Sequence, residues 1–169
     1  MITAKYQLDH YYPTDKYPYL SISFFNLYPV CASCNLSKSS NKLNFELYED
    51  IRSNNFSFKL DKGSLVKFLI TRNKSDLKIE FKGDKDYENM FSINALYSTQ
   101  DDIAEEIIIK NQIYNKIYRK QLRDEFSRNG ISDSLVNRFI LGNYVEIEEI
   151  HQRPMSKYMQ DIGKDIGLI

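Results

Sequence analysis

The chain has 169 residues, of which 42% are hydrophobic and 27% are charged, so its length fits one domain or a small module beside a larger partner region. Its 23 basic and 23 acidic residues cancel, which excludes the global positive field of a nucleic-acid coat protein but leaves room for a local basic groove. Because the chain has neither an apolar run of about 18 residues nor a leader-like start, we expect a cytoplasmic protein with reduced thiols and no membrane partner.

The first fifty residues predict a strand, a loop, a second strand and a short helix. Residues 5–9 alternate loosely and suit a strand that ends at His10. The Pro- and Tyr-rich stretch that follows predicts a loop, and residues 26–29 indicate a turn before the second strand. The Cys-x-x-Cys run that begins at residue 31 predicts a helix, which the polar residues 39–41 end.

The middle of the chain has the pattern of a small sheet. Residues 56–60 and 77–81 alternate apolar and polar side chains, and the run 65–71 is rich in residues that favour strands. Residues 61–63 indicate a turn. We therefore predict a short antiparallel meander that buries one face against the helices that follow.

Helical spacing dominates the last third of the chain. One long helix is predicted from residue 101 to about residue 129, because its apolar residues recur at helical intervals and its acidic start and basic end complement the helix dipole. Shorter helices are predicted over 132–140 and 156–166. The predicted fold is α+β, with an N-terminal unit over residues 1–50 and a β-meander plus helical accessory or partner-binding region over 51–169, separated near residues 45–55.

The residues that suggest chemistry all lie in the N-terminal unit. Hydrolysis of a phosphodiester needs a base to activate water and a cation at the phosphate. His10 suits the base, because a histidine side chain can take up a proton at physiological pH. Asp9 and Asn35 offer oxygen ligands that a hard ion such as Mg²⁺ or Mn²⁺ prefers. Asn26 is expected to tie the loop and hold His10 in its catalytic orientation, and Lys38, one helical turn past Asn35, is a candidate phosphate contact.

The order and spacing of these residues resemble the motif of HNH endonucleases, which belong to the ββα-metal superfamily. The matching series is Asp9-His10, Asn26-Leu27, Cys31-x-x-Cys34-Asn35 and Lys38. The resemblance covers residues 8–38 and implies a ββα-metal nuclease unit that cuts DNA, with RNA left open as a substrate. It implies Asp9 and Asn35 as metal ligands, His10 as the general base and Asn26 as a supporting catalytic-site residue.

A second resemblance concerns the cellular setting. Residues 91–106 and 153–157 are similar to segments of HNH effectors that accompany a defence ATPase, of the Septu and retron-associated types. This resemblance implies a role in bacterial defence against phage, with an ATPase as a partner protein.

One departure from the family pattern concerns zinc. Relatives carry a second Cys-x-x-Cys before the Asp-His pair, which completes a structural zinc site, but the eight residues before Asp9 contain no cysteine. A closed zinc site needs four ligands, so Cys31 and Cys34 alone are insufficient. Three explanations stay open: a start further upstream, a lapsed site, or another ligand, for which His151 is a candidate.

Alternative interpretations accompany the nuclease hypothesis. The missing cysteine pair and the neutral charge also fit a catalytically lapsed HNH-like module that binds nucleic acid or a partner ATPase. Cys31 and Cys34 could pack without metal, and Asn35 could cap the helix instead of binding a cation. The tyrosines of the first loop, Tyr11, Tyr12, Tyr17 and Tyr19, could pack against one another or stack on bases.

Overall fold

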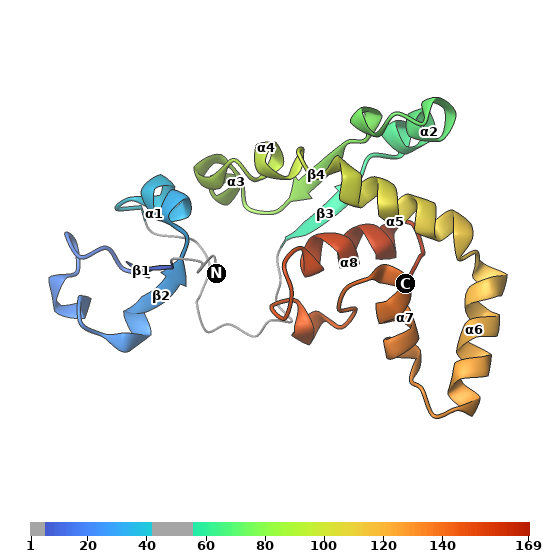
Figure 1. Ribbon diagram of the computed structural model, residues 1–169. Coiled ribbons are helices and arrows are strands. Elements are labelled where there is room, and N and C mark those ends of the chain that lie inside the picture. The colour runs from blue at the N-terminus through green and yellow to red at the C-terminus, as the bar shows by residue number, and fades with distance from the viewer. Residues whose placement is uncertain (1–5, 42–55) are drawn as a thin grey trace, which may run out of the picture. The chain divides into compact units, whose positions relative to one another are not determined.

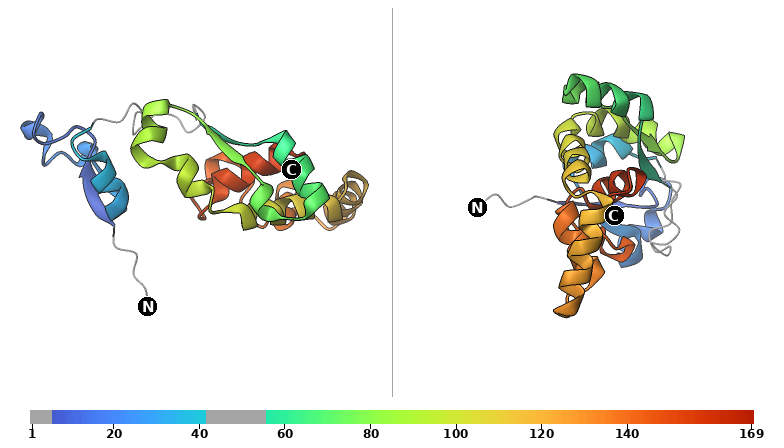
Figure 2. Two further views of the ribbon diagram at one scale, coloured as in Figure 1. Left: turned by 90° about the horizontal axis from the view of Figure 1, so that it is seen from above. Right: turned by 90° about the vertical axis from the view of Figure 1, so that its right-hand side faces the viewer.

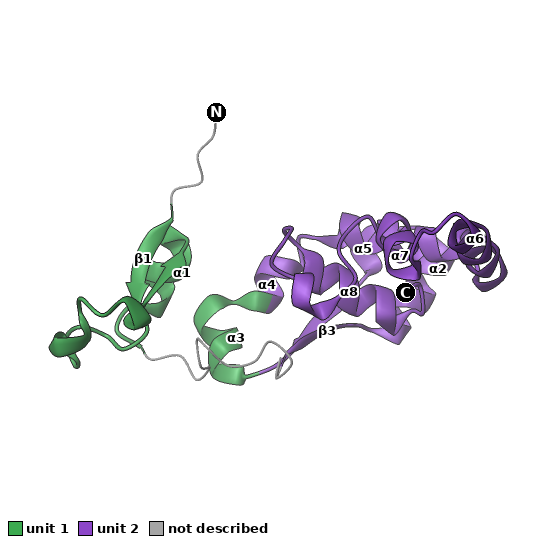
Figure 3. Cartoon of the chain, turned by 90° about the horizontal axis from the view of Figure 1, so that it is seen from below, with its two compact units in different colours: residues 1–50, 84–93 green, residues 51–83, 94–169 purple. Residues whose placement is uncertain are grey.

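The computed structural model describes residues 6–41 and 56–169, which form two compact units (Figure 1). The described residues of the N-terminal unit are 6–41 and 84–93, and those of the C-terminal unit are 56–83 and 94–169 (Figure 3). The boundary predicted near residues 45–55 lies outside the described residues. The fold class is α+β, in which helices predominate and two small antiparallel sheets contribute two strands each in the described part of the chain.

The N-terminal unit contains the predicted order of strand, loop, strand and helix. Strand β1 (Gln7–His10) pairs antiparallel with β2 (Leu27–Val30), and helix α1 (Ala32–Lys38) packs on β1. The predicted turn over 26–29 is wrong for its last three residues, because Leu27, Tyr28 and Pro29 already belong to β2. The α3 helix (Lys85–Phe91) contacts α1 in the same unit, although it follows β4 in the sequence.

The predicted meander of the C-terminal unit is a strand pair with a helix between its strands. Strand β3 (Ser57–Leu60) pairs with β4 (Ile79–Lys82), but the run predicted as a further strand lies in helix α2 (Lys62–Thr71). Asp61 caps this helix, because its Oδ2 accepts the Ser64 amide proton at 2.6 Å. The cap satisfies a free amide of the first turn, and this local signal overrides the strand propensity of residues 65–71.

The long helix predicted from residue 101 is two helices. Helix α5 (Asp101–Ile113) ends at Tyr114, and α6 (Lys116–Arg128) begins after Asn115. The Asn115 side-chain oxygen accepts two amide protons of the first turn of α6, from Ile117 and Tyr118. Asn115 is therefore an N-cap that divides the predicted helix.

The last two predicted helices are confirmed. Helix α7 (Asp133–Leu141) begins after Ser132, whose hydroxyl accepts the Leu135 amide proton. Helix α8 (Ser156–Asp165) follows, and the short α4 (Ile93–Tyr97) precedes α5. None of the helices in the described ranges has the length and apolar character that crossing a membrane requires.

The C-terminal unit packs its sheet against α8, and α6 lies alongside α7 (Figures 1 and 2). Asp161 and Asp165 of α8 accept the main-chain amide protons of Phe58 and Leu60, at 2.9 Å and 3.2 Å. These carboxylates occupy donors on the edge of β3 that would otherwise be open to another strand. The Phe58 ring also contacts Tyr158 on the same helix, so the edge is covered by polar and apolar groups together.

Candidate active site

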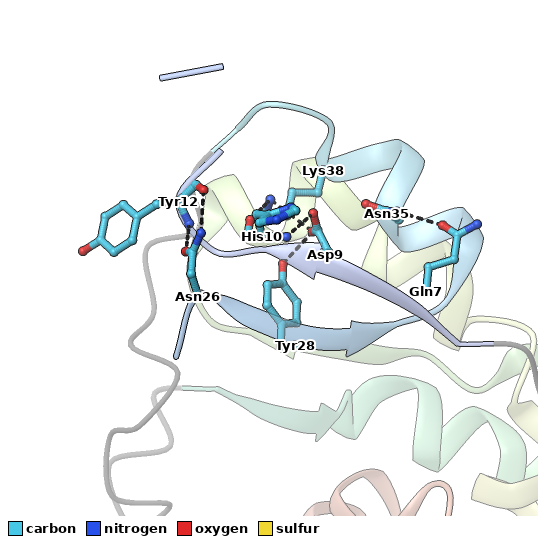
Figure 4. Close-up of polar contacts among 8 residues, drawn as sticks. All are labelled: Gln7, Asp9, His10, Tyr12, Asn26, Tyr28, Asn35 and Lys38. Atoms are coloured by element: carbon cyan, nitrogen blue, oxygen red, sulfur yellow. Dashed lines mark hydrogen bonds and ion pairs between the residues drawn. The ribbon is translucent and has the colours of Figure 1, made fainter. Parts of the chain in front are cut away.

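Asp9 is a buried carboxylate at the end of β1, with 7% of its surface exposed. Its Oδ1 accepts the His10 amide proton at 2.7 Å, and its Oδ2 accepts the Tyr28 hydroxyl proton at 2.8 Å (Figure 4). Tyr28 reaches it because the two residues are direct partners in the β1–β2 register. Burial, followed by the bond to Asp9, raises the pKa of Tyr28, so the phenol stays protonated and remains a donor.

Lys38 is the cationic partner of Asp9. It is the last residue of α1, it is 1% exposed, and its Nζ lies 3.1 Å from Asp9 Oδ2. The same ammonium donates to the main-chain oxygen of His10 at 2.7 Å. A buried ion pair of this kind is costly to break from one side, because the remaining charge has no partner. The phosphate contact predicted for Lys38 stays a prediction and requires this ion pair to open.

His10 has a defined tautomer in this arrangement. Its Nε2 lies 3.0 Å from the main-chain oxygen of Ser21. Because a carbonyl oxygen can only accept, Nε2 carries the proton, which leaves the lone pair on Nδ1. The imidazole is therefore oriented through one nitrogen and can act as a base through the other.

Asn26 joins the two ends of the loop between β1 and β2. Its side-chain oxygen accepts the Tyr12 amide proton at 2.7 Å, and its Nδ2 donates to the main-chain oxygens of Tyr12 and Leu20, each at 3.1 Å (Figure 4). The side chain is 3% exposed, so these bonds replace water that is excluded. Asn26 thus acts on the site by fixing the loop segment that supplies the Ser21 carbonyl to His10.

Asn35 lies one turn before Lys38 on the face of α1 that meets β1. Figure 4 shows Lys38 directed toward Asp9 and Asn35 directed toward Gln7, and Asn35 Nδ2 donates to Gln7 Oε1 at 2.7 Å. Gln7 and Asp9 are two residues apart and share a face of the strand. Asn35 therefore contacts the same strand as Lys38 but through Gln7 and not Asp9, and its metal-ligand role stays a prediction.

A shallow pocket of about 110 Å³ opens beside these groups. Its lining residues are Asp9, His10, Pro13, Thr14, Asp15, Lys38, Ser39 and Ser40. Asp15 was not predicted, although its place in the loop directly after the Asp-His pair was a usable signal. It brings a second carboxylate to the pocket, beside the candidate base and the candidate metal ligand.

The sequence also did not reveal the groups that hold His10 and Asp9 in place. Ser21 binds His10 through its main-chain oxygen, which no residue type in the sequence indicates. Tyr28 becomes a partner of Asp9 only through the strand register. Gln7 was accessible to inference, because alternation places it on the same strand face as Asp9.

Cys31 and Cys34 lie at the start of α1, where the Cys31 sulfur accepts the Cys34 amide proton at 3.3 Å. The bond with the Cys34 side chain, with help from Ser33, lowers the pKa of Cys31 to about 7, while burial raises the pKa of Cys34 to about 11. Over residues 6–41 and 56–169, no three His, Cys, Asp or Glu side chains gather so as to hold a metal ion. Among the described residues, Cys31 and Cys34 therefore have no third or fourth zinc ligand beside them, and His151 does not supply one.

The pocket contains carboxylate and hydroxyl oxygens, which are the kind of ligand that a hard divalent cation prefers. Mg²⁺ is commonly held by one or two carboxylates together with substrate phosphates, instead of by a closed protein cage. Of the two predicted metal ligands, Asp9 lines this pocket and Asn35 does not. The charge of Asp9 is balanced by the Lys38 ammonium, so a cation at Asp9 would have to displace that ammonium, and the metal-ligand roles of Asp9 and Asn35 stay predictions.

Comparison of the chain with protein-family models, with curated proteins and with solved structures finds no match. The family resemblance therefore rests on the motif of residues 8–38 alone.

Proposed function

We propose that this protein is a metal-dependent endonuclease of the HNH type that hydrolyses phosphodiester bonds of DNA. The candidate site combines a base, an acidic metal ligand and a lysine within one strand–strand–helix segment. The observation that carries the proposal is the orientation of His10, whose Nε2 is bound by the Ser21 carbonyl at 3.0 Å, in a pocket that Asp9 also lines.

In the proposed reaction, Nδ1 of His10 takes a proton from a water molecule as that water attacks the phosphorus atom. The bond from phosphorus to the leaving oxygen breaks, and that oxygen receives a proton from solvent. Asp9 and Asn35 would hold Mg²⁺ or Mn²⁺, whose positive charge would stabilise the negative charge on the phosphate and on the leaving oxygen. Asn26 acts through the loop, because it fixes the segment whose carbonyl orients His10.

The test is cleavage of plasmid DNA by the purified chain with Mg²⁺ or Mn²⁺. We expect His10→Ala to slow cleavage by about 10²–10⁴-fold, the usual contribution of a general base. The matched control is His151→Ala, which removes the other histidine of the chain, an exposed residue of the C-terminal unit. Equal cleavage by His10→Ala and the unaltered chain would contradict the assignment.

A second candidate function is a catalytically lapsed module that binds nucleic acid or a partner protein. The buried Lys38–Asp9 ion pair favours it, because the ammonium occupies the side of the carboxylate that a cation needs. The two functions differ in Mn²⁺ binding, which the nuclease proposal expects to weaken in Asp9→Asn. A chain that binds Mn²⁺ identically with and without Asp9, and that does not cleave, supports the lapsed module.

The biological setting follows from the sequence resemblance alone. We propose that the nuclease acts in bacterial defence against phage together with an ATPase, and co-purification of the chain with such a partner is the direct test. The second resemblance, which carries this setting, lies in residues 91–106 and 153–157, which are outside the motif of residues 8–38.

A further inference from the structure

The loop that orients His10 also presents large apolar side chains to solvent. Tyr19, Ile22 and Phe24 are 74%, 92% and 79% exposed. They lie in the same segment as Leu20 and Ser21, whose main-chain oxygens bind Asn26 and His10. Exposed apolar groups that gather in one segment beside a site indicate a contact surface.

The backbone of this segment is tightly turned. Amide protons of Leu20, Ser23 and Asn26 are donated to the carbonyls of Tyr17, Leu20 and Ser23, at 3.0, 3.1 and 2.9 Å. Two 3-10 turns, η1 (Pro18–Leu20) and η2 (Phe24–Asn26), result from such bonds. The exposed rings therefore stand on a backbone that is fixed relative to the candidate base.

The tyrosines earlier in the loop do not share this exposure. Tyr11 is buried, and Tyr12 packs edge-on against both Tyr11 and Tyr17, with ring centroids 4.9 Å and 5.1 Å apart. The packing interpretation therefore holds for these three tyrosines. Tyr19 and Phe24 each make an edge-on ring contact, with Tyr17 and Phe25 at centroid distances of 6.3 Å and 6.2 Å, but both stay largely exposed and can offer a stacking surface. The sequence did not single out Phe24.

The charge of the N-terminal unit does not favour binding of duplex DNA. Its described charged side chains are Lys16, Lys38 and Lys85 against Asp9, Asp15, Asp84, Asp86 and Glu88. Duplex DNA is held mainly through phosphate contacts to basic side chains, and this unit offers few of them. Stacking on aromatic rings contributes about 1–3 kcal/mol per base, a part of the binding energy that does not come from basic side chains, but it requires bases that are not already stacked in a duplex.

We propose that Tyr19, Ile22 and Phe24 form a surface on which unpaired nucleotides stack next to His10, so that the substrate is single-stranded or locally unpaired nucleic acid. This inference rests on the proposed nuclease function, since a phosphodiester bond that reaches His10 brings its flanking nucleotides to this loop. A protein partner seated on the same side chains is the competing outcome.

The test is fluorescence anisotropy of the full chain with a labelled single-stranded oligonucleotide and with the same sequence as a duplex, in EDTA to prevent metal-dependent cleavage. We expect the single strand to bind at least about tenfold more tightly than the duplex, the scale of one stacked base. Phe24→Ala and Phe24→Leu should each weaken single-strand binding about tenfold, whereas Phe24→Trp retains it.

The matched control is Phe139→Ala, which removes a ring of similar exposure, 77%, from the C-terminal unit and should leave binding unchanged. Equal affinity for single strand and duplex, absence of binding, or full affinity in Phe24→Leu would each overturn the proposal, the last because it indicates apolar contact of the kind that a protein partner makes. Ring-dependent binding without any cleavage contradicts the nuclease function alone. Cleavage that needs His10 but not Phe24 contradicts the stacking surface alone.

Discussion

The two units of this chain have interiors of different chemistry. In the described residues of the N-terminal unit, the buried side chains include Asp9, Asn26 and Lys38, and Tyr11 and Ile93 are the buried large apolar ones. The C-terminal unit buries mainly aromatic and aliphatic side chains, among them Phe58, Leu60, Phe68, Ile107, Leu141, Tyr158, Ile162 and Leu168. The first interior is a hydrogen-bonded polar network, and the second is an apolar core.

This difference shows that the same residues serve stability and the candidate function in the N-terminal unit. The polar groups buried in the N-terminal unit are the same groups that form the candidate site, so a substitution there changes both the chemistry and the folding free energy. In the C-terminal unit the core residues carry no candidate chemistry. Substitutions in the two interiors should therefore differ in what they do to metal binding and cleavage.

The largest expected effect is that of Lys38→Met, which leaves the buried Asp9 carboxylate without its cation. We expect a loss of about 3–5 kcal/mol in the free energy of unfolding, the usual cost of breaking a buried pair from one side. Hydrogen exchange of the β1 and α1 amides measures it, with the exposed Lys16→Met as the control. Added Mn²⁺ should restore part of the loss by replacing the ammonium, and unchanged exchange in Lys38→Met would show that the pair does not form.

The apolar interior is tested by Leu141→Ala, which removes a side chain with no exposed surface at the end of α7. We expect a loss of about 2–5 kcal/mol from lost burial and the cavity left behind. Urea denaturation measures it, and Ile70→Ala on the exposed side of α2 should change stability by less than about 0.5 kcal/mol. Similar losses in both variants would mean that Leu141 is not part of a packed core.

A smaller loss is expected for Asn26→Ala, which removes the bonds that the Asn26 side chain makes to the Tyr12 amide and to the Tyr12 and Leu20 carbonyls. The expected cost is about 1–3 kcal/mol, the range for buried polar groups left unsatisfied. Denaturation of the chain measures it, and Asn35→Ala, which removes a single bond to Gln7, is the comparison. A larger loss in Asn35→Ala than in Asn26→Ala would contradict the claim that the Asn26 side chain fixes the loop between β1 and β2.

The smallest effect concerns the thiols at the surface of the N-terminal unit. The lowered pKa of Cys31, about 7, gives a thiolate that increases as the pH rises through neutrality, whereas Cys34, with a pKa of about 11, stays a thiol at pH 8. Because the thiolate is the nucleophile, iodoacetamide should modify Cys31 first, with a rate that rises between about pH 6 and pH 8. Equal modification of Cys34, read by mass spectrometry, would contradict this order.

The sequence predicted elements where a local signal and the packing agree. The Cys-x-x-Cys run and the Ser132 and Ser156 starts placed α1, α7 and α8 correctly. Residues 65–71 failed because β-branched and aromatic residues suit either a strand or a buried helix, and the deciding signal was the Asp61 cap. The break at Asn115 was missed because helical spacing continues on both sides of it.

The sequence predicted the motif side chains of the candidate site but not the groups that bind them. His10 and Asp9 were chosen by residue type and order, which the sequence contains. The Ser21 carbonyl and the Tyr28 hydroxyl enter through loop closure and strand register, and these are properties of the folded chain. Lys38 was predicted as a phosphate contact, but the turn of α1 directs it to the Asp9 carboxylate in the interior.

Chemical rescue of His10→Ala by imidazole tests the central assignment most directly. A free base that fills the vacated space should restore metal-dependent cleavage in a concentration-dependent way, while Asp9→Asn, which lacks a charged ligand and not a base, should gain nothing. Cleavage that is unaffected by His10→Ala, or rescue of both variants alike, would contradict His10 as the base that activates water in this protein.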